Sequence, residues 1–294
     1  MLIPESVAFI IIMDDVRNMP HPDNIGRLLE EAISRGTEGK DLAVAFSGGL
    51  DSGLIAAVAR KYAARINLYT AGTVRSADGA EDQAWSYDAK MAVEMASDLD
   101  LRWNHIIIDE KELEKNVEEM VRITGTADLL TISFELPLFY VCANCKEEYI
   151  MTGQGADEIF AGDSKYVGLE EGALRTMMKD DLNKLRDITL DHEKKVAEHF
   201  GKKMVYPFLD EGLIAAAERM GTRELMPSEA GTRKAVLRSV AEEMGYHSIA
   251  MKEKKAAQYG SGVMDALRRL SKKNGMTCSE MISSIAEQAE VRGR

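Results

Sequence analysis

The sequence predicts an α/β fold of the Rossmann-like kind, in which helices flank a parallel sheet and a helical C-terminal subdomain follows. Three observations indicate this. Short aliphatic and β-branched runs alternate with helical periods over the first two-thirds of the chain. The connections between these runs are long enough for right-handed crossovers with helices on both faces of the sheet. After about Gly162 the strand signal fades and only helical periods continue.

The candidate strands are runs that fit a buried parallel sheet, at 7–13, 42–46, 66–70, 104–108 and 149–151. Amphipathic periods between them predict helices at 23–34, 52–64 and 88–99. The same periodicity then predicts helices at 179–200, 211–220, 231–244, 263–273 and 277–290.

These elements predict an N-terminal strand extension over 1–22 and one domain over 23–294, built from an α/β core at 23–165 and a helical part at 166–294. No internal repeat or Gly/Ser linker separates the two parts, so we expect them to pack together. In the last predicted helix, an apolar face would suit contact with a second copy of the chain in a homodimer. That face is formed by Met281, Ile282, Ile285 and Ala289.

Composition and charge narrow the class of protein. Of 294 residues, 45% are hydrophobic and 29% are charged, which is ordinary for a folded domain. The net charge of -12 argues against nucleic acid as a partner. The longest clean apolar run, at 7–13, is too short to span a bilayer, and no basic signal region precedes it. Three cysteines suggest reduced thiols, so we expect a cytoplasmic protein with no membrane partner.

A glycine-rich turn directly follows the predicted strand at 42–46 and opens a helix. Its glycines let the backbone approach a ligand, and the helix N-terminus that follows favours an anion. Asp51 is informative, because a carboxylate beside bound phosphates calls for a divalent cation between them. No lysine follows the glycines, so this is not a Walker A loop. The turn consists of Ser47, Gly48, Gly49, Leu50, Asp51 and Ser52.

A second glycine-rich segment, at 152–162, follows the predicted strand at 149–151. It reads Thr-Gly-Gln-Gly-Ala-Asp-Glu-Ile-Phe-Ala-Gly and places Asp157 at the carboxyl end of a parallel strand. Open α/β sheets bind ligands at that edge. Together with Asp51, Asp157 would supply a second carboxylate for Mg²⁺ bound to phosphates.

The first turn resembles the phosphate loop of the ATP pyrophosphatase (PP-loop) superfamily. The second resembles the Gly-x-Gly-x-Asp-Glu-x-Phe-x-Gly motif of asparagine synthetase synthetase domains. Segments at 205–210, 234–238 and 254–262 resemble that family's Pro-Phe-Leu-Asp element, Lys-x-x-Leu-Arg helix and basic loop, in the same order. The resemblance covers about 24–273 and implies an adenine nucleotide alpha-hydrolase-like fold.

The resemblance also implies an activity. A carboxylate such as aspartate would attack the α-phosphate of ATP, pyrophosphate would leave, and ammonia or another amine would capture the acyl-adenylate, as in asparagine biosynthesis. By resemblance, the residues from Ser47 to Ser52 would bind the pyrophosphate, and Asp51 and Asp157 would hold Mg²⁺. Lys255 would neutralise the leaving pyrophosphate, with Lys254 as the alternative register. The positions matching the family's adenosine site are Ala45, Ala71 and Gly153, and Thr152 is a further residue expected to bind ATP.

Three departures from the family bear on the substrates. Leu2 stands where class II glutaminase domains carry their nucleophilic cysteine, so we expect ammonia to come free or from a separate glutaminase subunit. Gln154 replaces a glutamate that helps deprotonate ammonia, and an amide is no base near neutral pH. Ser133 stands where we expect arginine. Glu135, nearby, would bind an amine or act as a base in place of Gln154.

Two other functions stay open. One is a tRNA-modifying sulfur transferase of the PP-loop superfamily, because some relatives hold an iron–sulfur cluster through three cysteines. Cys142 and Cys145 have the Cys-x-x-Cys spacing of such a site, and Cys278 lies far downstream. Cys142 and Cys145, however, fall on a predicted helix that runs into the strand at 149–151. The other is a catalytically silent ATP-binding subunit of a partner complex, which the replacement at Gln154 would explain.

Overall fold

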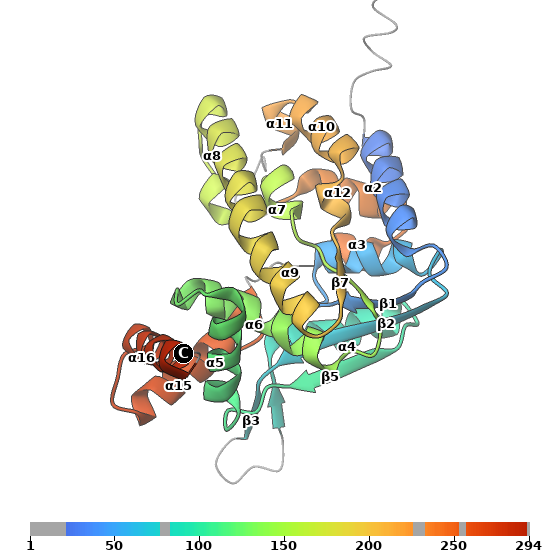
Figure 1. Cartoon of the computed structure of the whole chain (residues 1–294). Coiled ribbons are helices and arrows are strands. Elements are labelled where there is room, and N and C mark those ends of the chain that lie inside the picture. Colours follow the sequence, from blue (N-terminus) through green and yellow to red (C-terminus); the bar gives the residue numbers. More distant parts are fainter. Residues whose placement is uncertain (1–21, 77–82, 226–232, 253–256, 293–294) are drawn as a thin grey trace, which may run out of the picture.

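The computed structural model describes residues 22–76, 83–225, 233–252 and 257–292 (Figure 1). The predicted strand extension at 1–22 lies outside them, apart from its last residue. One five-stranded sheet forms the centre, in the order β5-β2-β1-β6-β7, and every pair in it is parallel. Its strands are β1 (Asp41–Ala45), β2 (Arg65–Gly72), β5 (Trp103–Ile107), β6 (Tyr149–Met151) and β7 (Lys203–Val205).

Strand β1 shows how the sheet divides the core. Leu42 and Val44 point to one face, whereas Ala43, between them, points to the other. Most of the described helices contribute to the core above the first face, either against the sheet or against one another. They are α2 (Pro22–Thr37), α3 (Leu50–Ala59), α4 (Tyr87–Asp98), α7 (Ala156–Ile159), α8 (Glu171–Lys184), α10 (Glu211–Arg219), α11 (Thr222–Leu225), α12 (Ala235–Glu243) and α13 (His247–Ala250).

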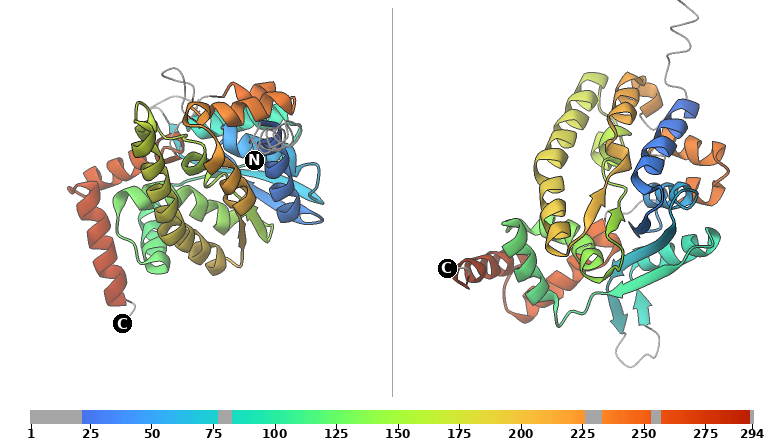
Figure 2. Two further views of the ribbon diagram at one scale, coloured as in Figure 1. Left: turned by 90° about the horizontal axis from the view of Figure 1, so that it is seen from above. Right: turned by 45° about the vertical axis from the view of Figure 1, so that its right-hand side comes forward.

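The second face is covered by helices from the middle and the end of the chain, which lie together in both figures (Figures 1 and 2). They are α5 (Leu113–Thr124), α6 (Leu129–Asn144), the end of α9 (Leu190–His199), α15 (Val263–Lys273) and α16 (Cys278–Arg292). The short helix α14 (Ala257–Gly260) packs on α6 and α15. Helices therefore cover both faces of the parallel sheet, as predicted.

The prediction that strands end near Gly162 is wrong. Strand β7 pairs in parallel with β6 at the edge of the sheet, so the second part of the chain completes the sheet of the first. A separate antiparallel hairpin, β3 (Val74–Ser76) with β4 (Gln83–Trp85), was also not predicted. Each of these strands has three residues, which is too short for a two-residue period to stand out.

The helix predicted over 179–200 is longer and interrupted. It begins as α8 at Glu171, passes through a π-helical turn (Leu185–Thr189), and continues as α9 to His199. A π turn inserts an extra residue and rotates the helix that follows it. His192 and Glu193 of α9 are consequently buried, while neighbouring Lys195 is exposed. Two 3-10 turns (Ser164–Tyr166 and Pro207–Leu209) and helix α5 were also not predicted.

The apolar face of the last helix is used within the chain. Met281, Ile282, Ile285 and Ala289 are buried in the second core, where α16 packs on α5. This face is therefore not available for the homodimer contact that the sequence led us to expect.

No single helix among the described residues combines the length and hydropathy needed to cross a membrane. Helices α5 and α6 meet both criteria only when joined, and they are bent by 101° at the break between them.

Candidate functional site

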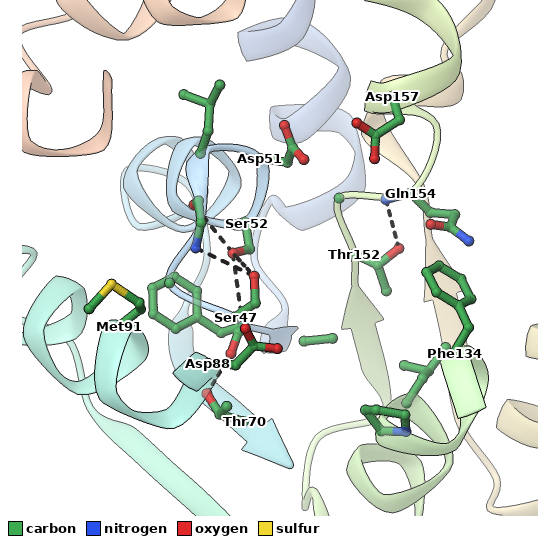
Figure 3. Close-up of a pocket in the computed structure, with 18 of the residues that line it drawn as sticks. Ser47, Asp51, Ser52, Thr70, Asp88, Met91, Phe134, Thr152, Gln154 and Asp157 are labelled. Atoms are coloured by element: carbon green, nitrogen blue, oxygen red, sulfur yellow. Dashed lines mark hydrogen bonds between the residues drawn. The ribbon is translucent and has the colours of Figure 1, made fainter. Parts of the chain in front are cut away.

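The candidate site lies where the strand order of the sheet reverses. From β1 the chain builds outward to β2 and β5, and then returns to place β6 and β7 on the opposite side of β1. The loops after β1 and β6 consequently diverge and leave a crevice at the carboxyl edge of the sheet, where doubly wound folds bind ligands. A cavity of about 680 Å³ occupies this position and is lined by both loops (Figure 3).

The loop after β1 presents unused hydrogen-bond donors to the cavity. Gly49 caps helix α3 with extended backbone, and no side chain in the described ranges caps the helix, so the first N–H groups of α3 are available to a ligand. The hydroxyl groups of Ser47 and Ser52 lie 3.3 Å apart, and the Ser47 backbone N–H donates to Ser52 Oγ at 3.3 Å. These contacts hold the loop in a shape suited to an anion.

Gly48 is required by the packing of this loop. Its φ is +72°, and a Cβ there would lie 2.4 Å from the backbone carbonyl carbon of Met91 in α4. We expect Gly48→Ala to lower the free energy of unfolding by about 3 kcal/mol, because left-handed strain and a backbone clash add. The measurement is urea unfolding of both proteins.

Gly39 provides the matched control for this prediction. Its φ is +68°, and a Cβ at this position would have no neighbouring atom within 4 Å. Gly39→Ala should therefore cost only the conformational strain, about 1 kcal/mol. Equal losses in the two variants would contradict the packing argument.

The loop after β6 brings the second carboxylate to the cavity. Gly155, with φ +95°, turns the chain into α7, and Asp157 lies in the first turn of that helix. Gly153 touches the first loop directly, since a Cβ there would come within 2.9 Å of Asp51 Cβ. Figure 3 shows Asp51 and Asp157 at the same end of the cavity.

Lys234 joins the two carboxylates. Its Nζ lies 2.5 Å from Asp51 Oδ2 and 2.8 Å from Asp157 Oδ1, and only 3% of its side chain is exposed. Burial by itself lowers the pKa of Lys234, but the charges of Asp157 and Asp51 outweigh burial and raise it. The lysine thus stays protonated and offsets one of the two negative charges.

Sequence reasoning did not assign a site role to Lys234, although it belongs to the Lys-x-x-Leu-Arg segment. The residue has left-handed backbone, with φ 57°, at the start of α12. Its side chain passes over Gly162, where a Cβ would lie 2.0 Å from Lys234 Cε. Gly162 is the last residue of the second glycine-rich segment, so the two motifs fit together.

A different end of the cavity is acidic and buried. Glu135 of α6 and Glu193 of α9 both line the cavity, with 4% and 5% of their surface exposed. Gln154 Nε2 donates to Glu193 Oε1 at 3.2 Å, and His192 Nδ1 lies 3.2 Å from Glu135 Oε1. The amide that replaces the family's glutamate therefore contacts a glutamate from another helix, which sequence reasoning missed.

Burial raises the pKa of both carboxyl groups. The pKa of Glu135 rises to about 8, mainly through loss of solvent and further through the neighbouring Glu193. The pKa of Glu193 also rises to about 8 through burial, with the Tyr206 hydroxyl opposing the rise and Glu158 adding to it. Burial lowers the pKa of His192, so this neighbour does not supply a compensating charge at neutral pH.

These pKa values predict how stability changes with pH. The folded state holds protons on Glu135 and Glu193 that the unfolded state, with an ordinary glutamate pKa of 4.5, has already released. Their contribution to stability is complete below pH 4.5 and is lost as the pH rises through about 8. We expect the double variant Glu135→Gln/Glu193→Gln to show a flatter fall in Tm over this window than the wild type.

The control for the pH measurement is Glu147→Gln. Glu147 is also buried, but its oxygens accept hydrogen bonds from Asn67 Nδ2 and from the Lys146 backbone N–H. Its variant should keep the wild-type dependence of Tm on pH. Parallel curves of Tm against pH for the wild type, the double variant and Glu147→Gln would contradict the assignment of raised pKa values to Glu135 and Glu193.

Most residues singled out in the sequence come together around this one cavity. Lys255 and Lys254 lie outside the described residues. Ser133 is fully buried and donates to the Leu130 carbonyl, so it does not face the cavity. The sequence-predicted residues that line the cavity are Ala45, Ser47, Gly48, Gly49, Leu50, Asp51, Ser52, Ala71, Glu135, Thr152, Gly153, Gln154 and Asp157.

The cysteines are not among the residues that line the cavity. Cys142 and Cys145 are buried in the second core, where burial raises the pKa of both thiols. Cys278 Sγ lies 3.3 Å from Ser271 Oγ. Across the described ranges, no three His, Cys, Asp or Glu side chains are grouped to hold a metal ion.

Asp51 and Asp157 nevertheless fit a magnesium ion that arrives with phosphate ligands. Mg²⁺ is usually held by one or two carboxylates together with substrate phosphates, rather than by a full cage of protein ligands. The Oδ1 atom of Asp51 is buried and has no hydrogen-bond partner among the described residues. Seven acidic and three basic described side chains line the cavity, so a phosphate ligand there needs accompanying cations.

The reversal in strand order, with glycine-rich loops on both sides of it, defines the class of protein: a doubly wound α/β protein with a ligand crevice at the carboxyl edge of its sheet. Comparison with known proteins is more specific. The family model described as Asparagine synthase matches residues 24–172 and 164–281. The chain belongs to the asparagine synthase family.

Two curated relatives illustrate the extent of the match. The Methanocaldococcus jannaschii protein named "Putative asparagine synthetase (glutamine-hydrolyzing) 1" is 28% identical over 292 residues, covering 86% of this chain and 52% of that protein. Asparagine synthetase B (glutamine-hydrolyzing) of Escherichia coli is 24% identical, and the match covers 84% of this chain and 46% of that protein. The chain thus spans about half the length of the curated relatives it matches.

Solved structures resemble the chain more distantly. NMN synthetase from Francisella tularensis aligns with a TM-score of 0.44 and 12% identity over 93% of this chain and 94% of that one. The U34-tRNA thiolase NcsA from Methanococcus maripaludis aligns with a TM-score of 0.39 and 13% identity, over 92% of this chain and 80% of that one. At these scores the likeness carries no argument about activity.

Proposed function

We propose that this chain is an ATP-dependent amide-forming ligase of the asparagine synthetase type. It activates a substrate carboxylate, aspartate or a related acid, as an acyl-adenylate with release of pyrophosphate. Ammonia or another amine then displaces AMP. The observation that carries this proposal is the meeting of the two glycine-rich loops at the reversal of the sheet, where Lys234 bridges Asp51 and Asp157.

Each part of the site has a place in this reaction. The free N–H groups at the start of α3 and the hydroxyls of Ser47 and Ser52 bind phosphate oxygens. Lys234 fixes the positions of Asp51 and Asp157, which would hold Mg²⁺. When bound, the ion neutralises charge on the leaving pyrophosphate. The adenosine lies against Ala45, Ala71 and Gly153, which line the same cavity.

The protein's contribution is orientation and neutralisation of charge. The substrate carboxylate and the α-phosphate are both anionic, so they must be brought together against their repulsion. Lys234 and Arg238 are positive groups beside the loop. By family resemblance, Lys255 adds a further positive charge to the departing pyrophosphate.

The test is ATP–pyrophosphate exchange with Mg²⁺ and a panel of carboxylates that includes aspartate. Products are separated so that AMP with pyrophosphate is told apart from ADP with phosphate. Exchange that depends on one acid and is lost in Asp51→Asn supports the proposal. ATP binding without exchange for any acid, with and without ammonia, would overturn it in favour of a silent subunit.

A further inference from the structure

The acidic end of the cavity contains two buried carboxyl groups that no cation in the described part of the chain neutralises. Glu135 and Glu193 come from different helices and line the same space. The oxygen Oε2 of each is buried and has no hydrogen-bond partner among the described residues. Leaving a buried carboxyl oxygen without a hydrogen-bond partner is costly, so each of these atoms calls for an explanation, and a bound cation is one.

The groups around this pair do not explain it by themselves. Gln154 donates to one oxygen of Glu193, and His192 contacts one oxygen of Glu135. Tyr206 and Glu158 also act on Glu193, and neither is a cation. The lysine among the cavity residues, Lys234, is already paired with Asp51 and Asp157.

A metal ion fits this end poorly. At Asp51 and Asp157, substrate phosphates bound by the loop after β1 would complete the ligands of Mg²⁺, but the two glutamates of the acidic end have no such partner ligands. Two carboxyl groups alone fall short of the six to eight oxygen ligands of Ca²⁺ and of the octahedral shell of Mg²⁺. An ammonium group needs only a few acceptors for its N–H donors. Leu138 and Val141 also line the cavity on the helix of Glu135 and provide apolar surface for a carbon chain.

We propose that Glu135 and Glu193 bind a primary ammonium group of a substrate. This inference rests on the proposed function, because it names the substrate chemistry of the same cavity. The ammonium belongs either to the amine that attacks the acyl-adenylate or to an amino acid whose carboxylate is activated. The raised pKa values agree with the proposal, since an empty pair of this kind keeps protons that a bound cation would displace.

If the ammonium is that of the nucleophile, the pair also accounts for the protons. One carboxylate takes a proton from R–NH₃⁺, and the freed nitrogen lone pair forms the C–N bond. The acyl C–O bond breaks, and its electrons leave with AMP. The second carboxylate takes the other proton from the nitrogen, so the products are the amide, AMP and two protons held by the enzyme.

Binding is tested first without catalysis. Calorimetric titration of the full chain uses methylammonium chloride, with tetramethylammonium chloride as a cation that has no N–H donors and magnesium chloride as a metal. We expect methylammonium to bind with release of protons, and its affinity to fall about 10- to 100-fold in Glu135→Gln and in Glu193→Gln. The matched control, Glu147→Gln, should bind as the wild type does.

The second test identifies which substrate carries the ammonium. If the two variants have a higher KM for the acid in pyrophosphate exchange, the ammonium group belongs to the amino acid. Unchanged exchange with a higher KM for the amine places it on the nucleophile. Either outcome supports the proposal, provided that Tm shows both variants to be folded.

Several results would overturn the inference. They are equal binding of methylammonium by the wild type and both variants, equal binding of the two organic cations, or magnesium binding that the variants lose. Failure of the proposed function is a separate result, because absence of exchange in the wild type leaves the calorimetric test intact.

Discussion

The Asp51→Asn variant should lose about 10³-fold in the rate of ATP–pyrophosphate exchange. Asparagine keeps the shape of the side chain but removes the charge that, in the proposed function, would face the phosphates and hold Mg²⁺. Loss of one preorganised electrostatic group in an active site typically costs 10²- to 10³-fold, and here the proposed metal ligand is lost as well. The measurement is initial-rate exchange at saturating ATP with the acid that supports it.

The matched control for this variant is Asp41→Asn. Asp41 begins β1, the strand that leads to the phosphate loop, but it pairs with Arg65 at the protein surface. It should retain wild-type exchange. If Asp51→Asn keeps more than a tenth of the wild-type rate, the carboxylate does not have the role proposed for it.

The Lys234→Met variant should lose about 3 kcal/mol of unfolding free energy at neutral pH. Removing one member of a buried ion pair leaves the other charge unpaired, which typically costs 3–5 kcal/mol. We expect the lower end of this range, because the side chains of Asp51 and Asp157 remain 22% and 29% exposed. The loss is measured by urea unfolding of both proteins.

Lys165→Met provides the comparison for Lys234. Lys165 also lies between two aspartates, with its Nζ 2.9 Å from Asp181 and 3.6 Å from Asp163, but 47% of its side chain is exposed. Exposed pairs contribute about 0–1 kcal/mol, so this variant should change stability little. A similar loss in both variants would mean that burial does not set the energy of the bridge at Lys234.

The strands and loops nearest the glycine-rich turn at 47–52 could be predicted from the sequence. Strands β1, β2, β5 and β6 lie within two residues of the predicted runs. The interiors of β1 and β6 are apolar and buried, whereas β5 is only partly buried and is revealed by its β-branched and aromatic residues. The glycine-rich turns were predictable for a different reason, which is the backbone conformation that they need. A positive φ and a close backbone approach require glycine at positions such as Gly48 and Gly155.

Other parts of the fold were not predictable from local pattern. Strand β7 has three residues and is defined by its pairing with β6, some fifty residues earlier in the chain. The apolar face of α16 was visible in the sequence, but its partner was not. That face packs on α5 within the same chain, rather than on a second copy.

The sequence by itself determined the order of strand, glycine-rich turn and helix. That order also placed Asp51 and Asp157 at the carboxyl edge of the sheet. These features depend on residues that are neighbours in the chain, so backbone conformation and hydrophobic period reveal them. Only the tertiary structure decided that Lys234 bridges these carboxylates and that Glu193 meets Glu135 and Gln154. The physical reason is that buried charges acquire their partners and their pKa values from helices that packing brings together, across separations of 39 and 183 residues.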